Sequence, residues 1–149
     1  MSDWLLFLHV LAAMLWVGGT AVLGAFALRI LRGRREDAGR FIASLRFVGP
    51  LVLAPSLVVL LVTGVWQVAD LEAWDFGQTW VQIGLALLIA VFLVGAVHQS
   101  RTAIAAERAA REGDDGEALR QLRRWTWGTL LNVALLVVAT WDMVFKPGL

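Results

Sequence analysis

The sequence contains no cysteine and few charged residues. The absence of cysteine over 149 residues excludes disulfide bonds, thiolate nucleophiles, cysteine-ligated zinc and iron–sulfur clusters. Charged side chains make up 17% of the chain and hydrophobic ones 59%, whereas a soluble domain has about 25% charged and about 45–50% apolar residues. The mean hydropathy is +0.72, and a soluble domain of this length buries only about 70% of its unfolded surface. The remaining apolar surface is therefore expected to face lipid.

Four long apolar runs carry few or no charges, and they cover residues 4–28, 47–68, 80–97 and 125–145. As helices they would be about 27 to 37 Å long, close to the roughly 30 Å hydrocarbon core of a bilayer. The runs are continuous in Leu, Val and Ala, which argues against the alternating strands of a β-barrel. The sequence therefore predicts an all-α integral membrane four-helix bundle, with a single transmembrane domain over residues 1–149.

Proline, glycine and acidic residues indicate where the helices begin and end. Gly49-Pro50 predicts the start of the second span, and Pro55 predicts a kink within it. The segment 102–111 is a strong helix former, and the following 112–116 stops one helix and caps the next. The third and fourth spans are therefore expected to continue as helical cytoplasmic extensions.

Arginine predicts the orientation. Twelve of the 13 basic residues lie in the connections 29–46 and 101–124, whereas the connection 69–79 has acidic residues and no basic one. The positive-inside rule then places both termini on the outer side of the cell (inner) membrane. The first span is expected to be retained and not to be removed as a signal peptide. The arginines are interpreted mainly as topology determinants and secondarily as contacts to anionic lipid. A net charge of +1 without a basic face predicts no nucleic-acid partner.

Tryptophan is frequent near the predicted span ends, where it anchors helices at the membrane interface. Together with the apolar runs, these tryptophans predict membrane lipid as a partner of the protein. The residues interpreted in this way are Trp4, Trp66, Trp74, Trp80, Trp125, Trp127 and Trp141.

Ionisable groups within the spans are few, and such groups are costly in lipid and therefore candidates for function. They are His9, His98 and Asp142. No span has a carboxylate near its midplane, which argues against a proton-coupled multidrug transporter, and no span has the arginines of a voltage sensor. A soluble-type catalytic triad is not supported, and no catalytic residue is predicted.

Depth in the membrane groups these candidates. His9 lies about 7 Å below the outer interface, and His98 lies at the inner end of the third span, so the two differ in depth by about 20 Å. One chain therefore cannot place both on one iron ion. The outer ends of the other spans bring further polar side chains to the depth of His9, which predicts an outer cluster of His9, Asp142, Gln67 and Gln82, with Met143 nearby.

The chemistry that suits this cluster is ligation of haem or copper through His9, with Met143 completing the pair of axial ligands. Asp142, Gln67 or Gln82 would hold the other imidazole nitrogen. Trp16 shares the helix face of His9 with small residues, which leaves room for a flat macrocycle but equally allows close helix packing. Alternatively, His9 is an interfacial histidine hydrogen-bonded to water or Asp142, and His98 is a hydrated residue at a helix end.

The first span reads LHVLAAMLWVGG over residues 8–19, with a histidine followed by tryptophan and glycines. This pattern resembles small membrane proteins related to the copper-resistance D (CopD) domain and to HemJ-type protoporphyrinogen oxidases. The later stretch LVTGVW over 61–66, Trp80 and the third span ending in His98 are similar to an uncharacterised family of predicted integral membrane proteins in that group. The resemblance implies a four-helix bundle, a b-type haem with His9 and His98 as residues of interest, or copper handling.

Three functions therefore stay open. A haem-binding redox or sensor protein is favoured by His9 and its small-residue face. A copper or small-solute permease is favoured by the likeness to CopD. A non-catalytic bundle that assembles with itself, as a homo-oligomer, or with a partner is favoured by the 14 glycines.

Overall fold

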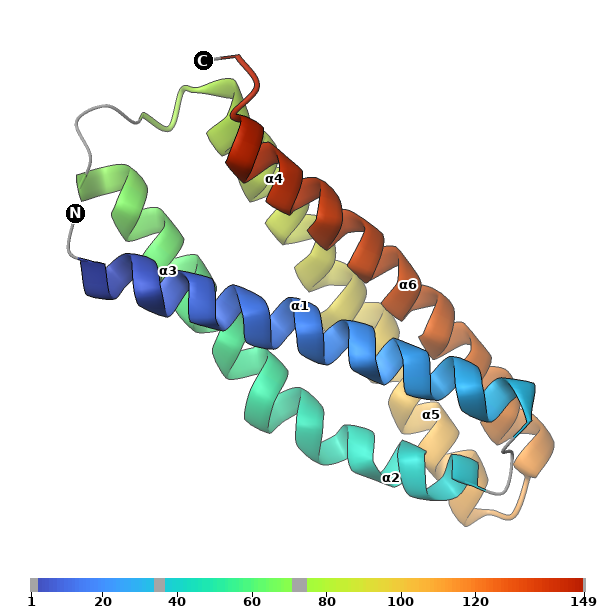
Figure 1. Cartoon of the computed structure of the whole chain (residues 1–149). Helices are drawn as coiled ribbons and strands as arrows, with labels where there is room; N and C mark the ends of the chain where they lie inside the picture. The colour runs from blue at the N-terminus through green and yellow to red at the C-terminus, as the bar shows by residue number, and fades with distance from the viewer. Residues whose placement is uncertain (1–2, 34–36, 71–74, 149) are drawn as a thin grey trace.

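The computed structural model describes residues 3–33, 37–70 and 75–148, and every long element in these ranges is helical. Four helices are long and apolar enough to cross a membrane, over Asp3–Arg32, Ala38–Ala69, Thr79–Arg111 and Asp115–Phe145. Successive helices run in opposite directions, so the first helix begins and the last helix ends at the same end of the bundle (Figure 1). The predicted all-α bundle of four spans is thus confirmed, whereas its orientation across the membrane stays a prediction.

The first span is α1 (Asp3–Arg32), and the second consists of α2 (Ala38–Val48), the π-helix η2 (Gly49–Leu53) and α3 (Ala54–Asp70). The expectation that this second helix starts at Gly49-Pro50 is wrong, because the helix begins at Ala38 and passes through both prolines. The Ala54 amide bonds to the Gly49 carbonyl oxygen, which is the longer spacing of a π-turn. A proline has no amide hydrogen to donate, and this wider turn directly precedes Pro55.

The third span is α4 (Thr79–Leu93), which continues through the π-helix η3 (Val94–Gln99) into α5 (Ser100–Arg111). The fourth is α6 (Asp115–Phe145), a single helix of 31 residues. Asp114 caps it by accepting a hydrogen bond of 2.9 Å from the Glu117 amide, and Gly113 takes the positive φ of 78° that ends the preceding helix. The predicted helical extensions and the turn between them are therefore present.

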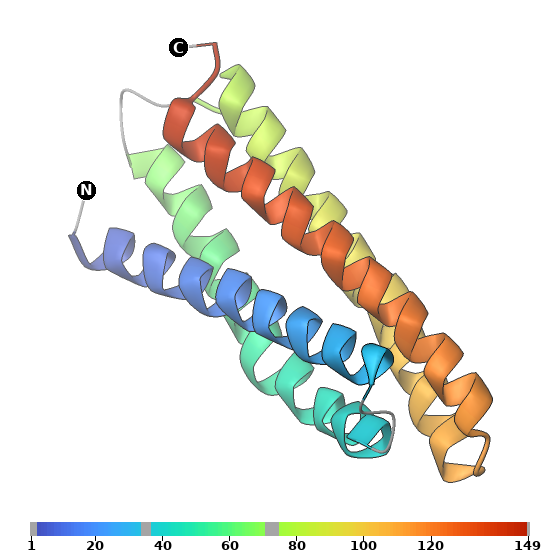
Figure 2. The same cartoon turned by 45° about the vertical axis from the view of Figure 1, so that its right-hand side comes forward.

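The bundle is arranged as two helix pairs, with the first span beside the second and the third beside the fourth (Figure 2). Helix α1 packs against α3 and α6, while α4 and α5 run along α6, and α2 packs against α5. One buried apolar cluster lies in the half where α1 begins and α3 ends, around Trp16, Leu60 and Leu136. A second lies at the opposite end, around Ile30, Leu122 and Trp125.

Most of the outer surface of the spans is apolar, which suits contact with lipid. Among the tryptophans expected at the membrane interface, Trp4, Trp66, Trp127 and Trp141 are exposed. Trp80 and Trp125 are instead buried between helices, because they lie on the packed faces of α4 and α6. Trp74 lies outside the described residues.

Candidate functional site

His9 of α1 lies against α3, where Thr63 is its partner. The His9 Nδ1 and Thr63 Oγ1 atoms are 2.9 Å apart. The Thr63 hydroxyl has one hydrogen, which it donates to the Val59 carbonyl oxygen at 2.6 Å. With that hydrogen used, the hydroxyl is left to accept from the ring, which in a neutral imidazole favours the tautomer with the proton on Nδ1 and the lone pair on Nε2. The imidazole therefore presents a free nitrogen ligand.

Gly64 allows this close approach. A Cβ atom at Gly64 would lie 3.2 Å from His9 Cε1, so the ring rests against the backbone of α3. One turn further on, Gln67 is buried and donates from its side chain to the Thr63 carbonyl oxygen at 3.2 Å. Gln67 thus lies beside the residue that holds His9, but its described hydrogen bond is made within α3.

Asp142 of α6 is fully buried, at 0% exposure, and neither carboxylate oxygen has a hydrogen-bond partner among the described residues. The carboxylate packs against α4, since a Cβ atom at Gly84 would lie 3.3 Å from Asp142 Oδ2. The hydrogen bond expected between Asp142 and His9, directly or through a glutamine, is therefore not formed. Asp142 faces α4 and His9 faces α3, so similar depth does not bring them into contact.

The other residues of the predicted outer cluster are dispersed. Gln82 is exposed, and its side chain lies 3.4 Å from the Phe76 carbonyl oxygen. Met143 is 40% exposed, and Trp16 is buried in the apolar core at 6%. Among the described residues, no three His, Cys, Asp or Glu side chains come together as a metal site would require.

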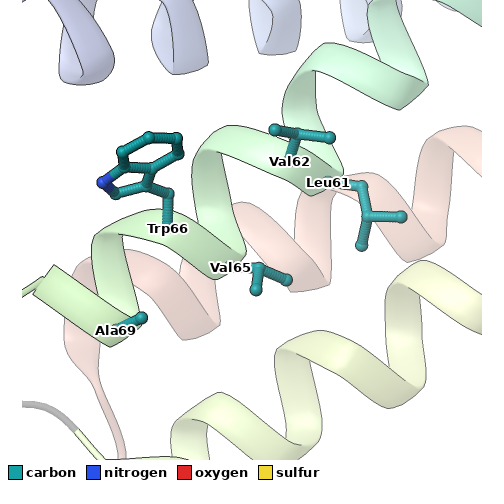
Figure 3. Close-up of a pocket in the computed structure, with 5 residues that line it drawn as sticks. All are labelled: Leu61, Val62, Val65, Trp66 and Ala69. Atoms are coloured by element: carbon teal, nitrogen blue, oxygen red, sulfur yellow. The ribbon is translucent and has the colours of Figure 1, made fainter.

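An apolar groove of about 530 Å³ runs along α3, on the face of that helix turned away from His9. Its lining comes from α3, and the side chains project from successive turns of that helix (Figure 3). Pockets for small molecules and cofactors have volumes of about 300–1,000 Å³. The lining residues are Leu61, Val62, Val65, Trp66 and Ala69, all exposed, whereas Thr63 is buried on the face that contacts His9.

His98 belongs to a different region of the bundle. Its side chain is exposed, and its Nε2 donates to the Arg124 carbonyl oxygen at 3.1 Å. The ring packs closely against α6, because a Cβ atom at Gly128 would lie 2.6 Å from His98 Cδ2. His9 and His98 therefore contact different helices.

A directed chain of hydrogen bonds lies next to His98. Gln99 donates to the Thr129 hydroxyl at 2.8 Å, and Asn132 donates to Gln99 Oε1 at 3.3 Å. The Thr129 hydroxyl donates in turn to the Trp125 carbonyl oxygen at 3.0 Å. The buried Asn132 Oδ1 is left without a partner among the described residues. This network ties η3 to α6.

The geometry can be compared with known families. A family model described as predicted integral membrane protein (DUF2269) matches residues 3–147. The chain belongs to the DUF2269 family. No curated protein and no solved structure matches the chain significantly. The predicted similarity to a family of integral membrane proteins is thereby confirmed, and the wider grouping with CopD and HemJ stays a prediction.

Sequence analysis of this DUF2269 protein missed Thr63, Gln99, Thr129 and Asn132. Thr63 lies inside the stretch LVTGVW, where its position directly before Gly64 is a usable signal. Asn132 is the single asparagine of the chain and interrupts the apolar run of the fourth span. Neutral polar side chains within a span deserve the same scrutiny as ionisable ones, because they too need partners in lipid.

Proposed function

We propose that this DUF2269 protein binds haem b through Nε2 of His9, near the end of the bundle where α1 begins. The observation that carries the proposal is the pair of contacts that Thr63 Oγ1 makes with His9 Nδ1 and with the Val59 carbonyl oxygen. They favour the neutral tautomer in which Nε2 is unprotonated. Histidines that ligate a metal almost always donate their other ring hydrogen to a neighbouring acceptor, which fixes the tautomer and ring orientation.

The surroundings of His9 suit a haem group in one further respect. The ring is half-buried between α1 and α3, which limits competition from water for Nε2. When bound, haem supplies one-electron transfer or ligand sensing. The role of the protein is to hold the imidazole at a set angle through Thr63.

The test is a visible absorption spectrum of the detergent-purified full chain, oxidised and reduced, after reconstitution with haem b. We expect His9→Gly to lose the spectrum of the histidine-ligated haem and added imidazole to restore it. His98→Ala is the matched control and should keep it, because His98 donates from Nε2 to α6. Loss in His98→Ala but not in His9→Gly would reverse the assignment, and retention in both would indicate adventitious binding and refute the proposal.

A second function, permeation of a cation such as copper(II), is favoured by one observation. The Asp142 carboxylate lies fully buried within a span, and it has no partner among the described residues. Charged groups inside membranes commonly mark ion pathways. Copper(II) uptake into proteoliposomes would be lowered by Asp142→Asn and left unchanged by Asp75→Asn, which alters an exposed carboxylate. Equal uptake by both variants would refute this function.

A further inference from the structure

A second groove lies at the opposite end of the bundle, between α2 and α5, with a volume of about 340 Å³. Its floor includes the small residues Gly39 and Ala43 of α2 and Ala110 of α5. Arg46 of α2 and Arg111 of α5 line it as well. The groove therefore combines an apolar floor with two guanidinium groups from different helices.

The two arginines share one carboxylate. Glu107 Oε1 lies 2.6 Å from Arg111 and 3.6 Å from Arg46. The trio carries one net positive charge, and the arginine side chains are 67% and 57% exposed. Each guanidinium has five N–H donors, so both keep donors free for a further acceptor. An anion can therefore join this trio without displacing Glu107.

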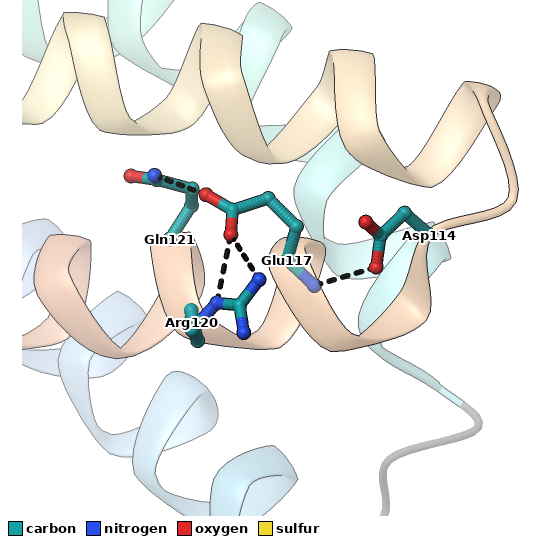
Figure 4. A network of polar contacts seen from close by, with 4 residues as sticks. All are labelled: Asp114, Glu117, Arg120 and Gln121. Atoms are coloured by element: carbon teal, nitrogen blue, oxygen red, sulfur yellow. Dashed lines mark hydrogen bonds and ion pairs between the residues drawn. The ribbon is translucent and has the colours of Figure 1, made fainter.

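Two other arginines at this end, Arg120 and Arg108, each have a carboxylate of their own. Arg120 is paired with Glu117 at 2.6 Å, and Gln121 also donates to Glu117 (Figure 4). These hydrogen bonds from Gln121 and Arg120 lower the pKa of Glu117. Arg108 is paired with Glu112 at 2.9 Å. The shared Glu107 distinguishes the groove from these balanced pairs.

The position along the chain places the groove at the membrane surface. Arg46 directly precedes the apolar run that begins at Phe47, and its Cζ lies 5.1 Å from the centre of the Phe47 ring. From Phe47 to Gly39 the helix extends about 12 Å away from the apolar core. The headgroup region on each side of a bilayer has a thickness of several Å beyond the hydrocarbon. Arg46 thus lies at the depth of lipid phosphates, and the shared Glu107 brings Arg111 to it.

We propose that this groove binds an anionic phospholipid, with its phosphodiester on Arg46 and Arg111 and its glycerol backbone against the small side chains of the floor. The net positive charge favours an anionic headgroup over a zwitterionic one, which brings its own cation. The apolar floor and the adjoining Phe47 favour a lipid over a soluble anion. This inference is independent of haem binding and of which side of the membrane the groove faces.

The test is native mass spectrometry of the full chain in detergent with phosphatidylglycerol or phosphatidylcholine. We expect preferential retention of phosphatidylglycerol, and about fivefold weaker binding in Arg46→Gln and in Arg111→Gln, since a basic residue near an anionic surface contributes about 1 kcal/mol. Arg108→Gln is the matched control, because it removes one positive charge from α5 outside the lining of the groove.

Gly39→Leu tests the groove without changing charge. A Cβ atom at Gly39 meets nothing within 4 Å, so the new side chain fills open space and should lower lipid retention while the unfolding temperature is unchanged. Equal retention of both lipids, an equal loss in Arg108→Gln, or an unaltered Gly39→Leu would overturn the proposal. Displacement of the lipid by millimolar inorganic phosphate would assign the site to a soluble anion instead.

Discussion

The hydrogen bond between His9 and Thr63 can be measured as a coupling free energy. Thr63→Val keeps the branched shape of the side chain and removes the hydroxyl, which accepts from His9 and donates to the Val59 carbonyl oxygen. The lost intrahelical bond costs little, because that carbonyl can keep its place in the helix ladder. The interhelical bond should account for most of the His9-dependent effect. Hydrogen bonds between helices of membrane proteins average about 0.6 kcal/mol, with a maximum of about 1.7 kcal/mol.

The assay is a double-mutant cycle of Thr63→Val with His9→Phe, read as unfolding in mixed detergent micelles by tryptophan fluorescence. Thr126→Val is the matched control, because Thr126 is also buried and its hydroxyl makes the same kind of bond, to the Leu122 carbonyl oxygen at 2.8 Å. We expect a coupling of about 0.6 kcal/mol for the first pair and none between His9 and Thr126. A coupling indistinguishable from zero for His9 and Thr63 would refute the hydrogen bond on which the tautomer argument depends. In the haem assay, Thr63→Val should weaken affinity about 10- to 100-fold.

Three further predictions concern other parts of the bundle. Gly128→Ala should lower stability, because its Cβ atom would lie 2.6 Å from His98 Cδ2, and His98→Ala in the same chain should restore much of the loss; an unaltered unfolding curve for Gly128→Ala would contradict this packing. Asn132→Leu should not destabilise the bundle, because the buried acceptor that it removes has no partner among the described residues and costs about 1–3 kcal/mol, more than the roughly 0.6 kcal/mol expected for the 3.3 Å bond to Gln99 that it also removes; a lower unfolding midpoint would contradict this balance. A topology reporter inserted at Gly113 should report the cytoplasm and one fused after Lys146 the outside, and the reverse result would overturn the arginine-based orientation.

The positions of the membrane spans and of the turn between the last two follow from local sequence features. Each span is recognisable as a continuous apolar run, because lipid requires backbone groups to bond within the segment and side chains to be apolar. The turn at Gly113 and the cap at Asp114 depend on neighbouring residues alone, so they too are predictable. Depth along a helix also follows from residue number, since each residue adds about 1.5 Å.

Rotation about each helix axis is what the tertiary structure decided. Sequence position placed His9 and Asp142 at similar depth, but packing turned His9 toward Thr63 of α3 and Asp142 toward Gly84 of α4. The π-turns of η2 and η3 also change which side chains face a neighbour, because each adds a residue to the turn. Hydropathy in a span that is apolar all round does not report that rotation. It follows from interhelical contacts between small and polar side chains, which form only when the helices come together.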